Sequence, residues 1–150
     1  MSATLQGTFA MTGRVTVAQH VRREHVGQRV SRSWTFTPAC PSGPCTSVML
    51  LRSRATGTDT LLLTEGPSGV YSGSGTFYLP LSCAGHRYPH GERVPFAITV
   101  RRQTTAVVNG TVVVTAVSAT YQNRSRRNLT PCVAVLGHDA ASYSGTLNPP

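Results

Sequence analysis

The sequence contains no lysine, and charged residues of every kind are scarce. Only 13% of its 150 residues are charged, about half the usual fraction of roughly 25%. All 14 basic residues are arginine, against 5 acidic residues, so the formal net charge is +9. A GC-rich genome would explain arginine without lysine, whereas selection for two-pronged contacts to phosphate or carboxylate is the functional alternative. In either case the charge would steer the protein toward anionic partners.

Long hydrophobic runs are also missing. Val48–Leu51 and Val112–Val114 are among the longest, whereas a membrane-spanning helix needs about 20 apolar residues. No stretch repeats apolar residues at the spacing of a helix, and glycine and proline recur too often for long helices. The sequence therefore predicts a soluble protein with neither a transmembrane segment nor an extended helix.

Apolar and polar residues alternate instead, which is typical of strands with one face on a core. In residues 30–37, Arg32, Trp34 and Phe36 share one face while serines and threonines take the other. Asn109-Gly110, between two valine-rich runs, is typical of a tight hairpin. The strands expected are residues 5–10, 14–21, 29–37, 46–54, 59–64, 70–80, 94–104, 111–121, 132–136 and 142–147, and the first two are candidates for one long bent strand.

These strands and their short connections predict a single all-β domain over residues 1–150. We expect an antiparallel barrel of about eight strands in a lipocalin-like meander. A two-sheet β-sandwich is the alternative, but a strand as apolar as residues 111–117 would then need covering at an edge. The longest irregular segments expected are residues 21–28, 83–93 and 122–131.

The four cysteines predict two disulfides and therefore an oxidising compartment. Cys40 and Cys45 flank a Pro-Ser-Gly-Pro turn that would bring their sulfur atoms together. Cys83 would then pair with Cys132, although four cysteines allow two other pairings and buried free thiols are a further alternative.

An exported protein needs a signal peptide, but the first residues contain neither the basic start nor the apolar stretch of one. We therefore expect Met1 to replace a removed leader and residues 148–150 to begin a linker or tail.

Few residues suggest catalysis or a metal site. Cys83, His86 and His90 offer ligands for a transition metal, but a disulfide would remove the thiol and a fourth ligand is not apparent. We therefore predict no metal and no cofactor. Gly73 and Gly75 flank a serine without the spacing of a hydrolase nucleophile, so they are expected to permit a bulge or bend in a strand.

The acidic residues are well separated along the chain, which gives no indication of an acid–base pair. The sequence therefore favours a function other than catalysis. These residues are Glu24, Asp59, Glu65, Glu92 and Asp139.

The densest basic sites lie in expected loops. Nucleic-acid binding is not predicted, because few aromatic side chains accompany the arginines and no nucleic-acid-binding fold signature is present. Contact with an anionic component of the cell envelope is the functional interpretation, and solvated loop charge is the simpler one. The arginines concerned are Arg22, Arg23, Arg124, Arg126 and Arg127.

Aromatic residues on several strands form either a packed core or the lining of a ligand cavity. The candidate ligand-binding residues are Arg32, Trp34, Phe36, Tyr71 and Phe77. Arg32 shares the face of Trp34 and would need an acidic partner, a place at the barrel mouth or an anionic ligand group. A cavity of roughly 300 Å³ or more lined by Trp34 and Phe36 would indicate a small-molecule carrier or an enzyme, and a solid core would shift function to the arginine-bearing loops.

The segment Trp34–Cys40, followed by Gly43-Pro-Cys45 and an apolar strand that ends at Arg52, resembles small exported domains of GC-rich Gram-positive bacteria. In such chains the domain follows a signal peptide or a lipobox, and its function is generally uncharacterised. The resemblance covers the first third of the chain. It implies export and two disulfides, but no activity and no functional residue.

The leading hypothesis is a secreted or cell-surface domain that binds a small apolar or anionic molecule in a barrel. One alternative is a structural or interaction module that binds anionic envelope polymers through its arginine-bearing loops. A small barrel enzyme is the other, and it predicts a cavity containing a titratable group with a strongly shifted pKa.

Overall fold

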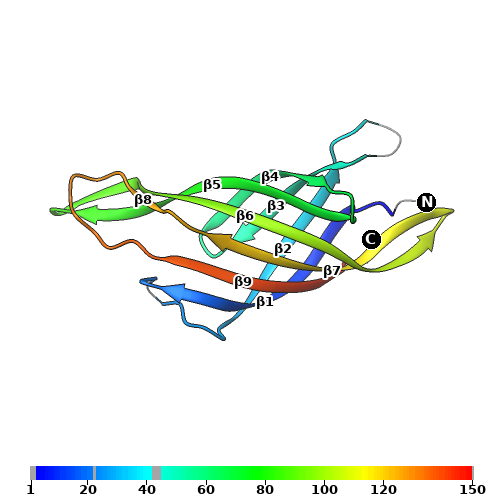
Figure 1. Cartoon of the computed structure of the whole chain (residues 1–150), viewed down its shortest axis with the longest axis horizontal. Helices are drawn as coiled ribbons and strands as arrows, with labels where there is room; N and C mark the ends of the chain where they lie inside the picture. Colours follow the sequence, from blue (N-terminus) through cyan, green and yellow to red (C-terminus); the bar gives the residue numbers. More distant parts are fainter. Residues whose placement is uncertain (1–2, 22, 42–44, 150) are drawn as a thin grey trace.

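The computed structural model describes residues 3–21, 23–41 and 45–149, and these residues form an all-β structure without a helix (Figure 1). No helix in this part of the chain could therefore cross a membrane. The strands are β1 (Gly7–Gln19), β2 (Arg29–Pro38), β3 (Ser47–Arg54), β4 (Gly57–Glu65), β5 (Val70–Cys83), β6 (His86–Val108), β7 (Thr111–Asn123), β8 (Arg127–Asn128) and β9 (His138–Leu147).

The strands close into the predicted antiparallel meander barrel. Each strand from β1 to β6 pairs with the one that follows it, and β9 lies between β7 and β1. The eight strands other than β8 form the closed barrel, and the short β8 pairs with β6 beside it. Among the strand pairings that close the barrel, the pairing of β4 with β5 is the shortest, with only Thr64↔Ser72 and Glu65↔Tyr71 in register. A closed barrel leaves β7 paired on both sides, which resolves the choice between barrel and sandwich.

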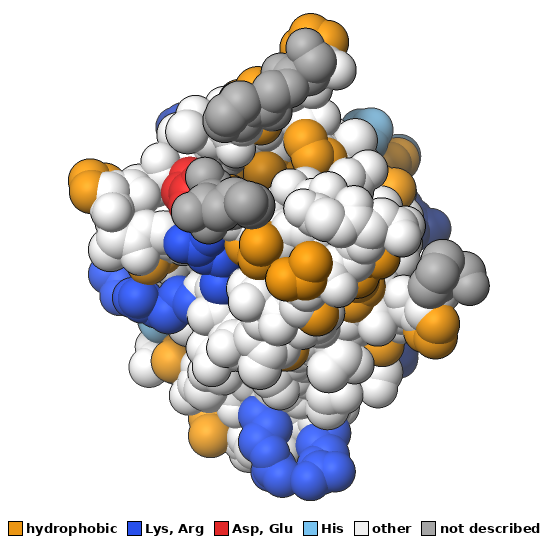
Figure 2. All heavy atoms as spheres, turned by 90° about the vertical axis from the view of Figure 1, so that its right-hand side faces the viewer, with side chains coloured by type: hydrophobic (Ala, Val, Ile, Leu, Met, Phe, Trp, Pro, Cys, Tyr) orange, Lys and Arg blue, Asp and Glu red, His pale blue; other side chains and the backbone are white. Residues whose placement is uncertain are grey.

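One half of the barrel is filled by the core. Phe9, Trp34, Phe36 and Leu50 are each at most 1% exposed, and the rings of Phe9 and Phe36 meet edge to face at 5.4 Å. At this closed end the segment before β1 crosses the barrel, with Ala3 and Leu5 among the buried residues and Thr4 bridged to Val113. Figure 2 faces this end, where hydrophobic side chains gather across the middle of the surface.

Two expected segments turn out differently. Residues 83–93 were expected to be irregular, but β6 begins at His86 and pairs with β5 almost from its start, for example Arg87 with Ser82. Residues 132–136 were expected to form a strand, but they are unpaired, and Val133 and Val135 are 102% and 75% exposed. Alternation alone cannot make a strand that has no neighbour. The two candidate strands over residues 5–21 are one strand, β1.

Gly73 and Gly75 serve close approach between elements. A Cβ on Gly75 would lie 2.8 Å from the ring of Phe96, and one on Gly73 would collide with the carbonyl oxygen of Leu62 on β4. The shift of register in β5 falls between Leu79 and Leu81 instead. The register of β5 is regular at both glycines, so the expected bulge is absent there, and their lack of a side chain serves close packing.

Both predicted disulfides are confirmed. Cys40 joins Cys45 across the β2–β3 loop, and Cys83 at the end of β5 joins Cys132 beyond β8. The second bond ties the projecting β5–β6 hairpin to the segment that leads into β9. Two disulfides are consistent with an extracellular location.

Candidate functional site

The other end of the barrel is open and contains a cavity of about 440 Å³. It lies on the left of Figure 1, where β1 ends and the β5–β6 hairpin projects. Its volume falls in the usual range of small-molecule sites, about 300–1,000 Å³. The apolar lining includes Val15, Val21, Val30, Phe77, Leu79, Ala141 and Tyr143, and the charged lining comprises Arg23, Glu24, Arg32, Arg52, Arg54, Arg126 and Asp139.

Arg52 is a charged residue on the inward face of β3, and its side chain is only 5% exposed. Strand register places it opposite Asp59 on β4, and Arg52 Nε donates a 2.8 Å hydrogen bond to Asp59 Oδ1. The guanidinium lies 4.5 Å from the ring centroids of both Phe96 and Tyr121, which offsets part of the cost of burying the charge. Within the described residues, the buried Nη2 of Arg52 has no hydrogen-bond partner.

Arg54 shares the same carboxylate. Its Nε lies 3.0 Å from Asp59 Oδ2, and its guanidinium stacks 4.3 Å from the ring centroid of Phe77. Two guanidinium groups thus face one carboxylate, and this wall keeps an excess positive charge.

Arg32 enters the cavity from β2, two residues before the fully buried Trp34. Its Nη1 donates a 2.9 Å hydrogen bond to the carbonyl oxygen of Ser31. No carboxylate of the described residues forms an ion pair with it. Arg32 therefore has no acidic partner among the described residues and lies at the mouth of the barrel.

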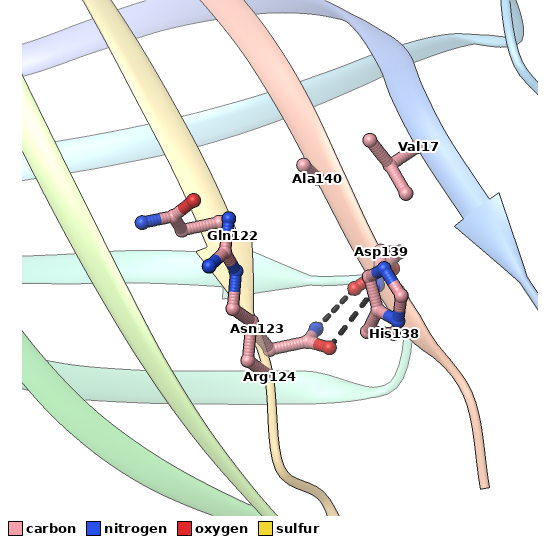
Figure 3. Close-up of a pocket in the computed structure, with 7 residues that line it drawn as sticks. All are labelled: Val17, Gln122, Asn123, Arg124, His138, Asp139 and Ala140. Carbon is pink, nitrogen blue, oxygen red and sulfur yellow. Dashed lines mark hydrogen bonds between the residues drawn. The ribbon is translucent and has the colours of Figure 1, made fainter.

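A second wall, on the side of β7 and β9, is acidic. Arg126 donates hydrogen bonds to Glu92 Oε2 at 3.1 Å and to Asp139 Oδ1 at 3.2 Å, so one guanidinium is shared by two carboxylates. Asn123 supports the arrangement: its Oδ1 accepts from Arg126 Nε at 3.0 Å, and its Nδ2 donates to Asp139 and to the hydroxyl of Tyr121. Figure 3 shows Asn123 and Asp139 joined between β7 and β9.

Glu24 adds a third carboxyl from the β1–β2 loop. The pKa of Glu24 is raised from 4.5 to about 8, first by burial and then by a hydrogen bond with Asp139 and the charge of Asp139. The charges of Arg126 and Arg32 lower this pKa by less. The Glu24 side chain therefore holds a proton near neutral pH. A shifted titratable group in a cavity is the feature that the barrel-enzyme alternative predicts.

Two tyrosines lie between the walls. Burial raises the pKa of Tyr121 to about 12, with the charge of Asp139 adding to the effect. Burial also raises the pKa of Tyr143, which the charges of Arg32 and Arg52 lower and those of Asp139 and Glu24 raise. Tyr143 thus experiences the charge of both walls.

The candidate ligand-binding residues divide into two groups. Arg32 and Phe77 line the cavity. Trp34, Phe36 and Tyr71 are at most 1% exposed and belong to the solid core of the closed half. The cavity is present, but its lining differs from the expected one, because alternation assigns a residue to the interior without fixing its depth along the barrel.

The candidate surface arginines also differ among themselves. Arg23, Arg124 and Arg127 are exposed. Arg126 is not at the surface, because its side chain is only 7% exposed between Glu92 and Asp139. Arg22 lies outside the described residues.

Sequence reasoning missed the groups that make the cavity polar. Arg52 continues the inward alternation of Val48 and Leu50, and a two-residue turn places Asp59 across from it. This signal was present in the sequence. The meeting of Glu24, Glu92 and Asp139 around Arg126 had no such signal, because three distant segments bring them together.

A second hollow of about 430 Å³ lies against β1, β7 and β9, with Val17, Gln122, Arg124 and His138 in its lining. In Figure 3 the side chain of Gln122 extends from β7 away from His138 on β9. Asn123 and Asp139 also line this hollow, but they are bonded to each other and to Arg126, so the open-end cavity is the better candidate.

Comparisons of the chain with family models, with curated proteins and with solved structures found no match.

Proposed function

We propose that this protein is an exported binding domain that takes a small, partly apolar molecule with an anionic group into the open end of its barrel. The observation that carries the proposal is the cavity of about 440 Å³ whose lining joins apolar side chains to guanidinium groups in excess of their carboxylate partners. Arg32 and the Nη2 of Arg52 are donors for an anionic group, and Phe77, Leu79 and Val30 supply apolar contact.

Export rests on the two disulfides and on the resemblance to exported two-disulfide domains of GC-rich Gram-positive bacteria. We favour binding over catalysis because the cavity and its guanidinium groups suffice for binding. Catalysis would require in addition a reactive substrate group aligned with Glu24.

The test compares two fluorescent probes that differ only by an anionic group, 8-anilinonaphthalene-1-sulfonate and the neutral N-phenyl-1-naphthylamine. We expect both to bind with one-to-one stoichiometry and the sulfonate to bind more tightly. Arg32→Gln should remove that preference, while Arg29→Gln, an exposed arginine of the same strand, should leave it intact. Absence of binding by both probes would overturn the proposal.

A second candidate is contact with anionic envelope polymers, supported by the exposure of Arg23, Arg124 and Arg127. The measurement is retention on an anionic polysaccharide column as salt rises. Exposed charges are screened beyond about 10 Å at 0.1 M salt and beyond about 3 Å at 1 M, so retention should collapse over this range. Arg124→Gln/Arg127→Gln should elute earlier than wild type, and unchanged elution would exclude these residues as the contact.

A further inference from the structure

The walls of the open-end cavity carry opposite charge. On one wall Arg32, Arg52 and Arg54 are accompanied by a single carboxylate, Asp59. On the other wall the carboxyl groups of Glu24 and Asp139 line the cavity beside a single guanidinium, that of Arg126, which also pairs with Glu92 outside the lining. Positive charge is therefore in excess on the first wall, and negative charge is in excess on the second.

Both walls face the same space. Arg32, Arg52, Glu24 and Asp139 all line the one cavity. The charges of these four residues all act on the Tyr143 hydroxyl, so this residue lies within electrostatic range of both walls. A single small ligand can therefore reach the two sets of charges at once.

The arginine side chains of the cationic wall are held in place by the protein around them. The Arg52 side chain is only 5% exposed, its guanidinium lies over the adjacent rings of Phe96 and Tyr121, and its Nη2 has no partner among the described residues. A buried donor without an acceptor is costly, and a ligand oxygen would remove that cost. On the acidic wall, Glu24 remains protonated near neutral pH because burial and the neighbouring Asp139 raise its pKa more than the charges of Arg126 and Arg32 lower it.

We infer that the ligand is a zwitterion, with its anionic group on Arg32 and Arg52, its cationic group on Glu24 and Asp139, and its apolar part against Phe77 and Leu79. This inference rests on the function proposed above and narrows the ligand to one chemical class. A simple anion would satisfy the guanidinium groups but would bring negative charge toward the Asp139 carboxylate. An ammonium group on the same molecule donates hydrogen bonds to both carboxyls and favours release of the Glu24 proton to the solvent.

The experiment uses probes that share one aliphatic chain. Calorimetry compares the zwitterions 2-aminooctanoate and 8-aminooctanoate with octanoate, octylamine and octanol. We expect at least one zwitterion to bind about tenfold or more tightly than octanoate, the factor contributed by one hydrogen bond between charged groups. The two zwitterions differ in the separation of their charges, and their ranking reports the distance between the walls.

Two variants separate the walls. Glu24→Gln should reduce the zwitterion to the affinity of octanoate while leaving octanoate itself unaffected or improved. Arg32→Gln should weaken octanoate and both zwitterions. Arg29→Gln and Glu65→Gln are matched controls, because Arg29 is exposed on β2 and Glu65 pairs with Arg102 toward the closed end.

Proton release gives an independent readout. When the zwitterion binds at pH 7, the heat should vary with the ionisation enthalpy of the buffer in wild type, because Glu24 gives up its proton, and this variation should vanish in Glu24→Gln. Octanoate binding as tightly as both zwitterions would overturn the inference while leaving the proposed function in place. Failure of every probe, octanol and octanoate included, would count against the proposed function itself.

Discussion

At the scale of single residues, Asp59 is important for stability because it balances the charge of two arginines. Its carboxylate, in a side chain 9% exposed, is the shared partner of Arg52 and Arg54. Removing one partner of a buried ion pair leaves the other charge without compensation, and this loss is larger than the net value of the pair. Substitution of Asp59 and substitution of Arg52 should therefore destabilise the protein by different amounts.

We expect Asp59→Asn to lower the free energy of unfolding by about 3–5 kcal/mol, because two buried cations lose their counter-charge. Arg52→Met should cost less, since Asp59 keeps Arg54 and the aliphatic replacement can still pack against Phe96. Urea unfolding followed by tryptophan fluorescence measures both. A larger loss in Arg52→Met than in Asp59→Asn would contradict this ranking.

Glu24 gives the stability a pH dependence of defined sign. Its pKa is about 8 in the folded protein, against 4.5 ordinarily, so between these values the folded state holds a proton that the unfolded state has lost. This stabilisation is complete below about pH 4.5 and disappears as pH rises toward 8. Glu24→Gln should flatten that decline in the free energy of unfolding, measured by urea unfolding across the same range. An identical slope in the variant would show that other groups cause it.

At the scale of elements, the strands that the sequence predicts well are those with clear alternation and definite turns. Residues 29–37 and 111–121 match β2 and β7 closely. The start of β6 could not be predicted, because Pro89 and Gly91 lie in a composition typical of loops. Pairing with β5 stabilises this part of β6. The Cys83–Cys132 disulfide also links the β5–β6 hairpin to the segment that follows β8.

The depth of a side chain inside the barrel is the other quantity that local pattern does not contain. Trp34 and Arg32 lie on the same face of β2, yet one is in the solid core and the other lines the cavity. Depth depends on which strands close over each position, and closure is set by pairings such as β1 with β9. The candidate site was therefore predicted only in part.

The two disulfides should differ in their effect on stability. In the chain-entropy account, the 49-residue separation of Cys83–Cys132 corresponds to about 4 kcal/mol and the 5-residue separation of Cys40–Cys45 to about 2 kcal/mol. Cys83→Ser/Cys132→Ser should thus lower the free energy of unfolding more than Cys40→Ser/Cys45→Ser, as measured by urea unfolding. Equal losses would show that local packing outweighs loop length.

At the scale of the whole molecule, the barrel is divided into a solid half and an open half. Hydrophobic packing in the closed half supports the strands, so charged side chains can be placed at the other end without loss of the fold. The net charge of +9 is consistent with attraction of an anionic group to this end. Specificity would then arise inside the cavity, where low exposure strengthens electrostatic interactions.

The pairing of β9 between β7 and β1 also sets an order of events in time. Until residues 138–147 are available, β1 and β7 each have one unpaired edge in an open sheet, because β9 is the second partner of both strands. Such long-range pairing is slow to form, and exposed edges invite pairing with other chains. The ring of strands, and with it the cavity, cannot be completed until residues 138–147 have emerged.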